Sequence, residues 1–351
     1  MIPEKLNKGD TIGVIAPSNY IKEDDLEYIN ASIALMEASG FKVKFGNYVF
    51  ENTLNYGTDP RRRAKDINMM FADKEVKAIL CVKGGEDSNS CLDYIDYEII
   101  KNNPKIICGF SDNTSILDVI NEKTGLVTYH GPTFKSFTSW DTGYAYEQFI
   151  KKLTENNKEN VSMGEAKNFS ASENTGNKNI NISIDESEQE SSKDGLEKYT
   201  EEFLSRVIGE PEDAYTTIKA GKAKGQLVGG NLSLFTKLVC GKYAVNVENK
   251  ILFLEELGFE TGPEATNSNI YYLKQNGVFD KIAGLWIGNY EHQSKITLEE
   301  IIMNAIGDEY SFPIIKSNNF GHTERKTVIP VGAKAKIDTT KDTKIEILEN
   351  L

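Results

Sequence analysis

A serine stands at a sharp corner of the chain, within the stretch KIICGFSDNTSILDVI at residues 105–120. The apolar run before Ser111 predicts a buried strand, and the residues after it predict a helix from about Asn113 to Lys123. Ligands of open α/β sheets bind at the carboxyl ends of the strands, which is where this hydroxyl lies. The corner is therefore suited to present Ser111 as a nucleophile. An alternative stays open, in which Ser111 or Asp112 only caps the helix.

Backbone N–H groups near this corner are candidates to stabilise the negative charge that develops on an attacked carbonyl oxygen. The first amides of a helix have no partner inside it, and Asp112 supplies one of them. A Gly-Gly pair in KGGEDSN at 83–89 follows another apolar run, so the N–H of Gly85 is a second candidate. A tight turn is the alternative role of this pair and of Gly229 with Gly230. These stretches lack the G-x-S-x-G pattern and the phosphate-binding loop pattern.

A serine nucleophile needs a base, and the chain has three histidines: His130, His292 and His322. His292 lies in a polar stretch and is expected to be exposed, whereas sequence position barely separates His130 from His322. The carboxylate that would orient the base is better defined, because Glu255 ends the apolar strand ILFLE and is held on a rigid element. Glu256 should point to the opposite face. The alternative is that both acids only end the strand in solvent.

The elements that must position these groups alternate along the first 130 residues. Strands are predicted at 11–17, 41–46, 76–85 and 105–110, with helices at 23–40, 59–73 and 92–104. Asp59 is the expected N-cap of its helix, with Pro60 at the first helical position. Strand and helix in alternation predict a parallel sheet that is covered on both faces.

Length and composition divide the chain into three parts. Its 351 residues exceed the size at which one core usually keeps growing, so two domains are expected. Residues 1–150 form an N-terminal α/β domain that carries the serine. Residues 151–220 form a polar linker or insertion, most biased at 155–202. Residues 221–351 form a C-terminal α/β domain that carries the glutamate and histidine, with a partly antiparallel sheet and a hairpin turning near Thr339 to Asp342.

Charge and cysteine content exclude several classes of protein. The formal net charge of -13 disfavours a nucleic-acid or anionic membrane surface, since both need clustered Lys and Arg. Cys81, Cys91, Cys108 and Cys240 show no C-x-x-C spacing and are expected to be buried free thiols in a reducing compartment, with no zinc site. The chain shows neither a signal-peptide pattern nor a long apolar stretch, so we expect a soluble, cytoplasmic protein.

Several motifs, taken in order, resemble one family. They are GVIAPS, GTDPRRRAKDINMMFAD, KGGEDSN, LDYIDYEIIKNNPKIICGFSDNTSI, TGLVTYHGP, GQLVGGNLS, ILFLEE and FGHTERKTVIPVGAKAKID. The order resembles that of the LD-carboxypeptidases and microcin C self-immunity proteins, which are serine peptidases with a Ser-Glu-His triad. The resemblance implies that Ser111 is the nucleophile, Glu255 the triad acid and His322 the base. It also implies that the backbone N–H groups of Gly85 and Asp112 form the oxyanion hole.

The same resemblance implies a fold and an assembly. The N-terminal domain would be a flavodoxin-like or class I amidotransferase-like parallel sheet. The C-terminal domain would be a swivelling α/β domain with a mixed sheet. The protein would form a homodimer with the active site between the domains of each chain, and no metal or organic cofactor is expected.

The resemblance leaves two substrates open. GGEDSN and the chain length are more similar to the microcin-immunity branch, which implies cleavage of an amide bond in a small peptide or an aminoacyl nucleotide. Trp140 and Trp286 lie outside the segment where that branch carries an aromatic residue that stacks on the base. The alternative is a murein tetrapeptide LD-carboxypeptidase of cell-wall recycling, acting on a muropeptide. An alternative of another class is a non-catalytic module that binds an anion or nucleotide at the Gly-Gly corners.

Overall fold

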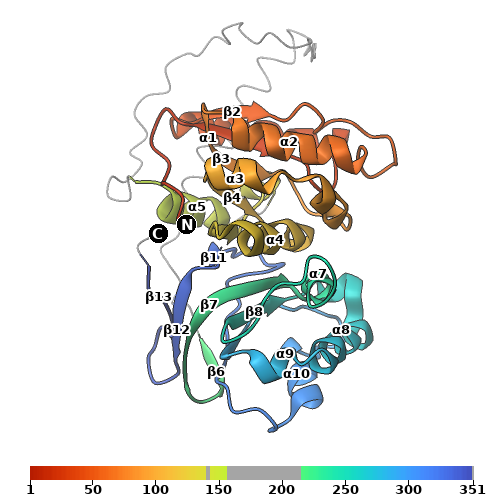
Figure 1. Ribbon diagram of the computed structural model, residues 1–351, viewed down its shortest axis with the longest axis vertical. Coiled ribbons are helices and arrows are strands. Elements are labelled where there is room, and N and C mark those ends of the chain that lie inside the picture. Colours follow the sequence, from red (N-terminus) through yellow and green to blue (C-terminus); the bar gives the residue numbers. More distant parts are fainter. Residues whose placement is uncertain (140–142, 156–214, 350–351) are drawn as a thin grey trace, which may run out of the picture.

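The computed structural model describes residues 1–139, 143–155 and 215–349 (Figure 1). The polar segment expected at 155–202 lies outside the described residues except for its first position, as does Trp140. Two sheets, each with its own helices, lie one above the other in the view of Figure 1. No helix in the described parts of the chain is long and apolar enough to cross a membrane.

The N-terminal sheet has the strand order β11-β5-β4-β3-β1-β2. Its parallel strands are β1 (Thr11–Ile15), β2 (Lys42–Phe45), β3 (Val76–Cys81), β4 (Ile106–Gly109) and β5 (Thr128–His130). Its helices are α1 (Leu26–Ala38), α2 (Pro60–Ala72), α3 (Tyr97–Asn102), α4 (Thr114–Thr124) and α5 (Tyr144–Leu153). Along β3, Ala78 and Leu80 join one apolar cluster while Ile79 and Cys81 join another, so both faces of the sheet are buried as the alternation predicted.

The C-terminal sheet is mixed, with the order β13-β12-β7-β8-β9-β10-β6. Its strands are β6 (Thr216–Lys219), β7 (Lys222–Asn231), β8 (Ile251–Glu255), β9 (Gly284–Ile287), β10 (Ile314–Lys316), β12 (Lys334–Asp338) and β13 (Ile345–Ile347). Strands β7 to β10 are parallel, whereas β6, β12 and β13 pair antiparallel, which confirms the predicted terminal hairpin. Its helices are α7 (Leu232–Phe235), α8 (Gly258–Gln275), α9 (Val278–Lys281) and α10 (Leu298–Ile306).

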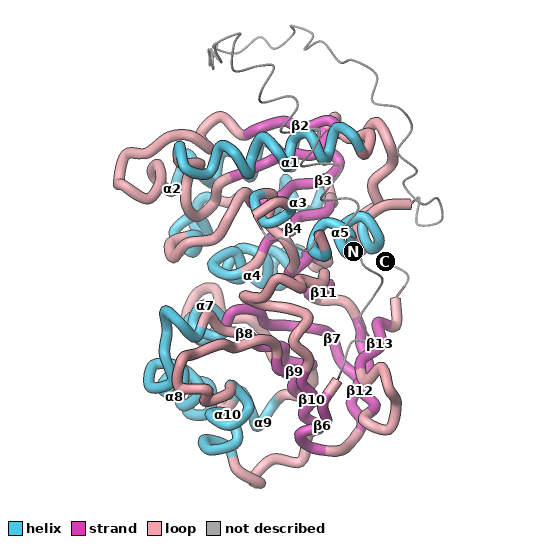
Figure 2. The backbone as a smooth tube through the Cα atoms, turned by 180° about the vertical axis from the view of Figure 1, so that it is seen from behind, coloured by secondary structure: helices cyan, strands magenta, loops and turns pink. Residues whose placement is uncertain are grey.

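One strand crosses between the two halves of the molecule. Strand β11 (Ile329–Val331) follows the loop that carries His322, yet it pairs antiparallel with β5 of the N-terminal sheet. Figures 1 and 2 both place β11 between the two domains. The histidine loop is therefore anchored at one end in the C-terminal sheet and at the other in the N-terminal sheet.

The structure confirms the predicted cap of α2 but corrects the predictions for one helix and one cysteine. The Oδ1 atom of Asp59 accepts hydrogen bonds from the next two free amides of α2, which confirms the predicted cap. The predicted helix at 92–104 was partly wrong, because a 3-10 segment, Ser88–Tyr94, ends before Asp96 caps the separate α3. All four cysteines are free, but Cys240 is exposed and not buried as expected.

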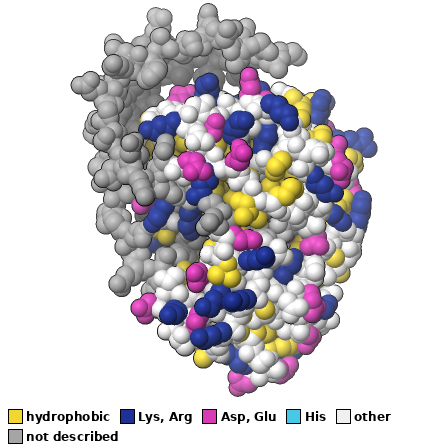
Figure 3. Space-filling view, turned by 60° about the vertical axis from the view of Figure 1, so that its left-hand side comes forward, with side chains coloured by type: hydrophobic (Ala, Val, Ile, Leu, Met, Phe, Trp, Pro, Cys, Tyr) yellow, Lys and Arg dark blue, Asp and Glu magenta, His cyan; other side chains and the backbone are white. Residues whose placement is uncertain are grey.

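Basic and acidic side chains are interspersed on the face of the molecule that Figure 3 shows. Small groups of hydrophobic side chains lie among them. The described residues on this face therefore form no single continuous basic surface, in keeping with the acidic composition.

Candidate active site

Ser111 occupies a strained backbone position directly after β4. Its φ is 61°, in the left-handed region that residues other than glycine seldom adopt. A Cβ atom at Gly84 would lie 3.3 Å from the Ser111 Oγ, so the Gly-Gly loop after β3 passes directly beside the hydroxyl. Neither Ser111 nor Asp112 caps α4 with its side chain. The capping alternative is therefore wrong, and the serine hydroxyl takes part in a different interaction.

His322 lies between the serine and a carboxylate. Its Nε2 is 3.1 Å from the Oγ of Ser111, and its Nδ1 is 2.7 Å from Oε2 of Glu255. The same oxygen accepts the backbone N–H of His322 at 3.2 Å, and Asn289 donates to the His322 carbonyl at 2.9 Å. Gly321 allows this approach, because its φ is 97° and a Cβ there would lie 2.7 Å from Glu255 Oε2. The structure thus brings together three residues that are distant in sequence.

The electrostatics of the pair suit a base that becomes charged during a reaction. Burial of Glu255 would raise the pKa of its carboxyl, but the adjacent His322 holds that pKa below its ordinary value. Burial likewise lowers the pKa of His322, and Glu255 outweighs this effect so that the pKa is raised overall. A carboxylate that stays ionised therefore faces Nδ1 and stabilises an imidazolium.

A buried lysine, Lys326, lies over the ring of Phe110, the residue before Ser111. The Nζ of Lys326 is 4.7 Å from the centre of the Phe110 ring and donates to the carbonyl of Thr323. The same ring meets the His322 imidazole edge-on, with centroids 5.2 Å apart. Burial lowers the pKa of Lys326 to about 7. This charge opposes protonation of His322 and was not found from the sequence.

Within the described residues, the two other histidines make no hydrogen bond to Ser111 or Glu255, although His130 also meets the Phe110 ring edge-on. His130 ends β5 and is buried, and its ring nitrogens have no partner within the described residues. Burial lowers the pKa of His130 to about 4, so it is neutral near pH 7. His292 contacts Ser294 in a polar loop at 2.7 Å. The structure therefore shows which histidine contacts Ser111: it is His322 and not His130, a distinction that the local sequence did not provide.

The two proposed oxyanion donors lie in loops that are bonded to each other. Oδ2 of Asp112 accepts from the Ser18 hydroxyl at 2.5 Å and from the Ser88 amide at 2.8 Å. The Ser88 hydroxyl donates to the Asp112 carbonyl at 2.7 Å. A Cβ at Gly85 would lie 2.4 Å from the Ser18 Oγ, so the Gly85 backbone packs closely on the loop after β1. Three strand ends thus meet around Ser111.

Comparison with protein families identifies the two halves of the chain. The model of the LD-carboxypeptidase N-terminal domain matches residues 12–131, and that of the C-terminal domain matches residues 224–337. The chain belongs to the LD-carboxypeptidase family. Members of this family are serine peptidases. Ser111 falls in the first matched range, and Glu255 and His322 fall in the second.

Individual relatives of this LD-carboxypeptidase family member cover nearly its whole length. A probable murein peptide carboxypeptidase of Bacillus subtilis (strain 168) is 29% identical, over 98% of this chain and 93% of the relative. The microcin C7 self-immunity protein MccF of Escherichia coli is 26% identical, over 96% and 93%. The crystal structure of an MccF-like protein from Bacillus anthracis is 28% identical, with a TM-score of 0.77 over 98% of both chains. The expected two-domain α/β fold is thereby confirmed.

Two other sequence candidates serve the packing of this family member. Glu256 is buried on the far side of the β8 end, where it accepts from the Asn231 side chain at 2.8 Å and the Ser233 amide at 2.9 Å at the start of α7. The alternative in which Glu255 and Glu256 only end the strand in solvent was wrong, because both are buried. Gly229 donates its N–H to Asp118 Oδ1 of α4 at 3.1 Å. This Gly-Gly corner joins the two domains, which disfavours its use as an anion site.

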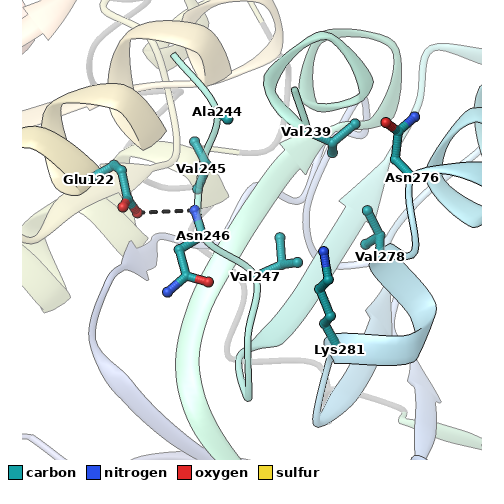
Figure 4. Close-up of a pocket in the computed structure, with 9 residues that line it drawn as sticks. All are labelled: Glu122, Val239, Ala244, Val245, Asn246, Val247, Asn276, Val278 and Lys281. Carbon is teal, nitrogen blue, oxygen red and sulfur yellow. Dashed lines mark hydrogen bonds between the residues drawn. The ribbon is translucent and has the colours of Figure 1, made fainter. Parts of the chain in front are cut away.

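Two further features of the described residues concern metal and ligand sites away from Ser111, Glu255 and His322. Within them, no group of three His, Cys, Asp or Glu side chains is placed to hold a metal ion. A cavity of about 280 Å³ between the domains is lined by none of Ser111, Glu255 and His322 (Figure 4). It lies beside the Asn246 amide, which donates to Glu122 at 3.2 Å. Its lining is formed by Glu122, Val239, Ala244, Val245, Asn246, Val247, Asn276, Val278 and Lys281.

Proposed function

We propose that this chain is a serine peptidase that cleaves an amide bond in a small peptide or an aminoacyl nucleotide, as in the microcin-immunity branch of its family. The observation that carries the proposal is the hydrogen-bonded series from Ser111 through His322 to Glu255. A hydroxyl, an imidazole and a buried carboxylate in this order form the general arrangement for nucleophilic attack on a carbonyl. The strained φ of Ser111 adds support, since such strain is frequent at active sites.

The proposed reaction has two steps. Ser111 Oγ attacks the amide carbonyl while His322 Nε2 takes the hydroxyl proton, and Glu255 stabilises the resulting imidazolium. The N–H groups of Gly85 and Asp112 would hold the oxyanion. The C–N bond then breaks as His322 gives its proton to the leaving amine. In the second step His322 activates a water molecule that hydrolyses the acyl ester and frees Ser111.

A murein tetrapeptide is the second candidate substrate. The Bacillus subtilis relative carries a murein peptidase name, and hydrolysis of the bond to a terminal D-amino acid would use the same groups. Trp286 offers no exposed surface for a nucleotide base, because the residue is 4% exposed and its Nε1 donates to Ser317 at 2.9 Å. Trp286 is therefore not available to stack on a nucleotide base.

Assembly and location are further parts of the proposal. We expect a homodimer from the family resemblance, and a cytoplasmic location because the four cysteines are free thiols. Sedimentation at micromolar concentration measures the first, and fractionation of the source cells measures the second. A monomer under all conditions would remove the dimer from the proposal.

The test incubates the purified protein with a muropeptide tetrapeptide and, separately, with an aminoacyl sulfamoyl adenosine, and identifies the products by mass spectrometry. We expect turnover of one of them, and a loss of about three orders of magnitude or more in Ser111→Ala. Full activity of that variant with its fold unchanged would refute the assignment. Ligand-dependent thermal stabilisation without turnover, surviving removal of Ser111 and His322, would indicate the non-catalytic binding module instead.

A further inference from the structure

Arg63 carries a guanidinium that is buried in the N-terminal domain, although it lies on the surface helix α2. Its side chain is 1% exposed. Its Nη1 donates to the carbonyl of Pro17 at 2.8 Å, and its Nη2 donates to Asp87 Oδ2 at 2.6 Å and to the Ser90 hydroxyl at 2.9 Å. A weaker contact joins Nη1 to the Asp87 carbonyl at 3.3 Å. One side chain thus binds the loop after β1 and the loop after β3.

These are the two loops that surround the proposed oxyanion donors. The loop after β3 carries Gly85, whose backbone packs on Ser18 and Asn19 of the loop after β1. The side chain of Ser18 in turn holds Asp112, the residue that supplies the other amide, and Ser88 holds it from the opposite loop. Arg63 joins both loops just behind this junction.

We propose that Arg63 is a positioning residue for the oxyanion hole, which it preorganises by fixing the loop after β1 against the loop after β3. The inference rests on the proposed function. Amides aimed at a developing oxyanion are effective only if they need no reorganisation during the reaction. Loops at strand ends keep their backbone amides in a fixed orientation only if neighbouring side chains hold them. The planar guanidinium of an arginine can do so because it donates to several acceptors at once.

A role confined to holding α2 in place does not account for these contacts. The helix is already fixed by its Asp59 cap and by the buried Ala64, Ile67 and Phe71. The Nη1 and Nη2 atoms of the guanidinium instead donate hydrogen bonds to acceptors that lie outside the helix. Its removal is therefore expected to loosen the two loops more than the helix.

The experiment compares Arg63→Ala and Arg63→Lys with wild type, and uses Arg62→Ala as a matched control. Arg62 is the adjacent residue, but its side chain is half exposed and pairs with Glu51 at the surface. The first readout is the rate at which a fluorophosphonate labels Ser111, because that reaction forms a Ser111 O–P bond, expels fluoride and needs no knowledge of the natural substrate. The second readout is kcat and KM on whichever substrate turns over, and the third is the melting temperature.

We expect labelling and kcat to fall by about 10²–10³-fold in Arg63→Ala, the effect of losing one oxyanion donor, with KM little changed. Lysine should not restore the rate, since a point charge cannot bridge both loops. Millimolar guanidinium, far below denaturing concentrations, should restore part of the Arg63→Ala rate and leave Arg62→Ala unaffected. These rates are to be measured well below the melting temperature of each variant.

One outcome would overturn this inference alone: Arg63→Ala has a lower melting temperature, but is labelled by the probe and turns over substrate at the wild-type rate. The proposed function would then still stand, because the enzyme would be active. Full activity of Arg63→Lys or absence of guanidinium rescue would also overturn the inference. A wild-type chain inert toward the probe and both substrates would overturn the proposed function, and this inference with it.

Discussion

Nδ1 of His322 lies 2.7 Å from Oε2 of Glu255, a carboxylate that is completely buried at the end of β8. The backbone N–H of His322 donates to the same oxygen, so it holds the His322 loop against the end of the Glu255 strand. This geometry fixes the orientation of the imidazole and leaves Nε2 facing Ser111. This arrangement and its surroundings lead to five predictions.

Substitution of Glu255, the proposed triad acid, should be far more harmful to activity than substitution of Glu256. Glu255→Gln removes the charge that stabilises the imidazolium, so kcat/KM should fall by about 10³–10⁴-fold. Glu256→Gln removes the charge that holds the start of α7, so it should lower the melting temperature but keep kcat/KM near wild type. Steady-state kinetics and thermal melts of the pair make the comparison. Equal activity of the two variants would contradict the role given to Glu255.

Addition of one methyl group at Gly321 should disrupt the site. Its Cβ would meet Glu255 at 2.7 Å and the backbone has a φ of 97°, so Gly321→Ala should displace His322 and reduce kcat/KM by about 10²-fold or more. Gly125→Ala is the control, because Gly125 also has a positive φ, 72°, but its Cβ would meet nothing within 4 Å. That variant should lose only about 1 kcal/mol of stability and no activity. A fully active Gly321→Ala would show that the close approach is dispensable.

Removal of the buried cation should move the acid limb of the pH–rate profile. The charged groups that act on His322 are Glu255 and Glu256, which raise its pKa, and Lys326, which lowers it, with burial also lowering it. Lys326→Met should therefore raise the pKa of His322, so that kcat/KM begins to fall at a higher pH than in wild type. Profiles of both proteins between pH 5 and 9 measure the shift. An unmoved limb, or one moved to lower pH, would be inconsistent with this electrostatic role.

Lys326→Met should also be more stable than wild type, by an amount that decreases as pH rises. Burial lowers the pKa of Lys326 to about 7 in the native state, below its ordinary value of 10.5, so the unfolded state binds more protons between these values. The cost of charging Lys326 is then largest below pH 7 and disappears as pH rises toward 10.5. Lys326→Met should gain most in melting temperature at pH 6 and least at pH 10. The opposite trend would mean that Lys326 is stabilised as a cation.

Asp118 should make the domain contact sensitive to pH. Burial raises its pKa to about 8, while Lys250 lowers it and Glu122 raises it to a smaller extent. The native state therefore binds more protons than the unfolded state between about pH 4 and 8, so the contribution of this group to stability is lost as pH rises through that range. Asp118→Asn cannot ionise, and its melting temperature should gain on wild type as pH rises from 5 to 9. A constant difference would show that Asp118 does not titrate there.

Local sequence patterns were sufficient for much of the frame around the nucleophile. The apolar run before Ser111 and the helical spacing after it placed the serine at a strand end, which the structure bears out with β4 and α4. The Asp59 and Pro60 pair marked the start of α2 in the same way. Such features depend on residues a few positions apart, whose periodicity and capping are written directly in the sequence.

The burial of Arg63 is also consistent with the helical pattern of its segment. It stands four residues before Ile67 and eight before Phe71, on the buried face of a predicted helix. A charged side chain on that face needs buried hydrogen-bond partners, so the spacing predicts that Arg63 makes a buried polar contact. It does not name the contact, because Pro17 and Asp87 come from other parts of the chain.

Composition, strand and helix periodicity, caps and the serine corner were determined by the sequence itself, and the family resemblance pointed to His322. Only the tertiary structure decided the choice on physical grounds, since His130 and His322 are equivalent as local patterns. It buries His130 between aromatic rings and brings His322 to a serine 211 positions away. The physical reason is that β11 pairs with β5 of the other domain, and such long-range pairing depends on the packing of the whole chain.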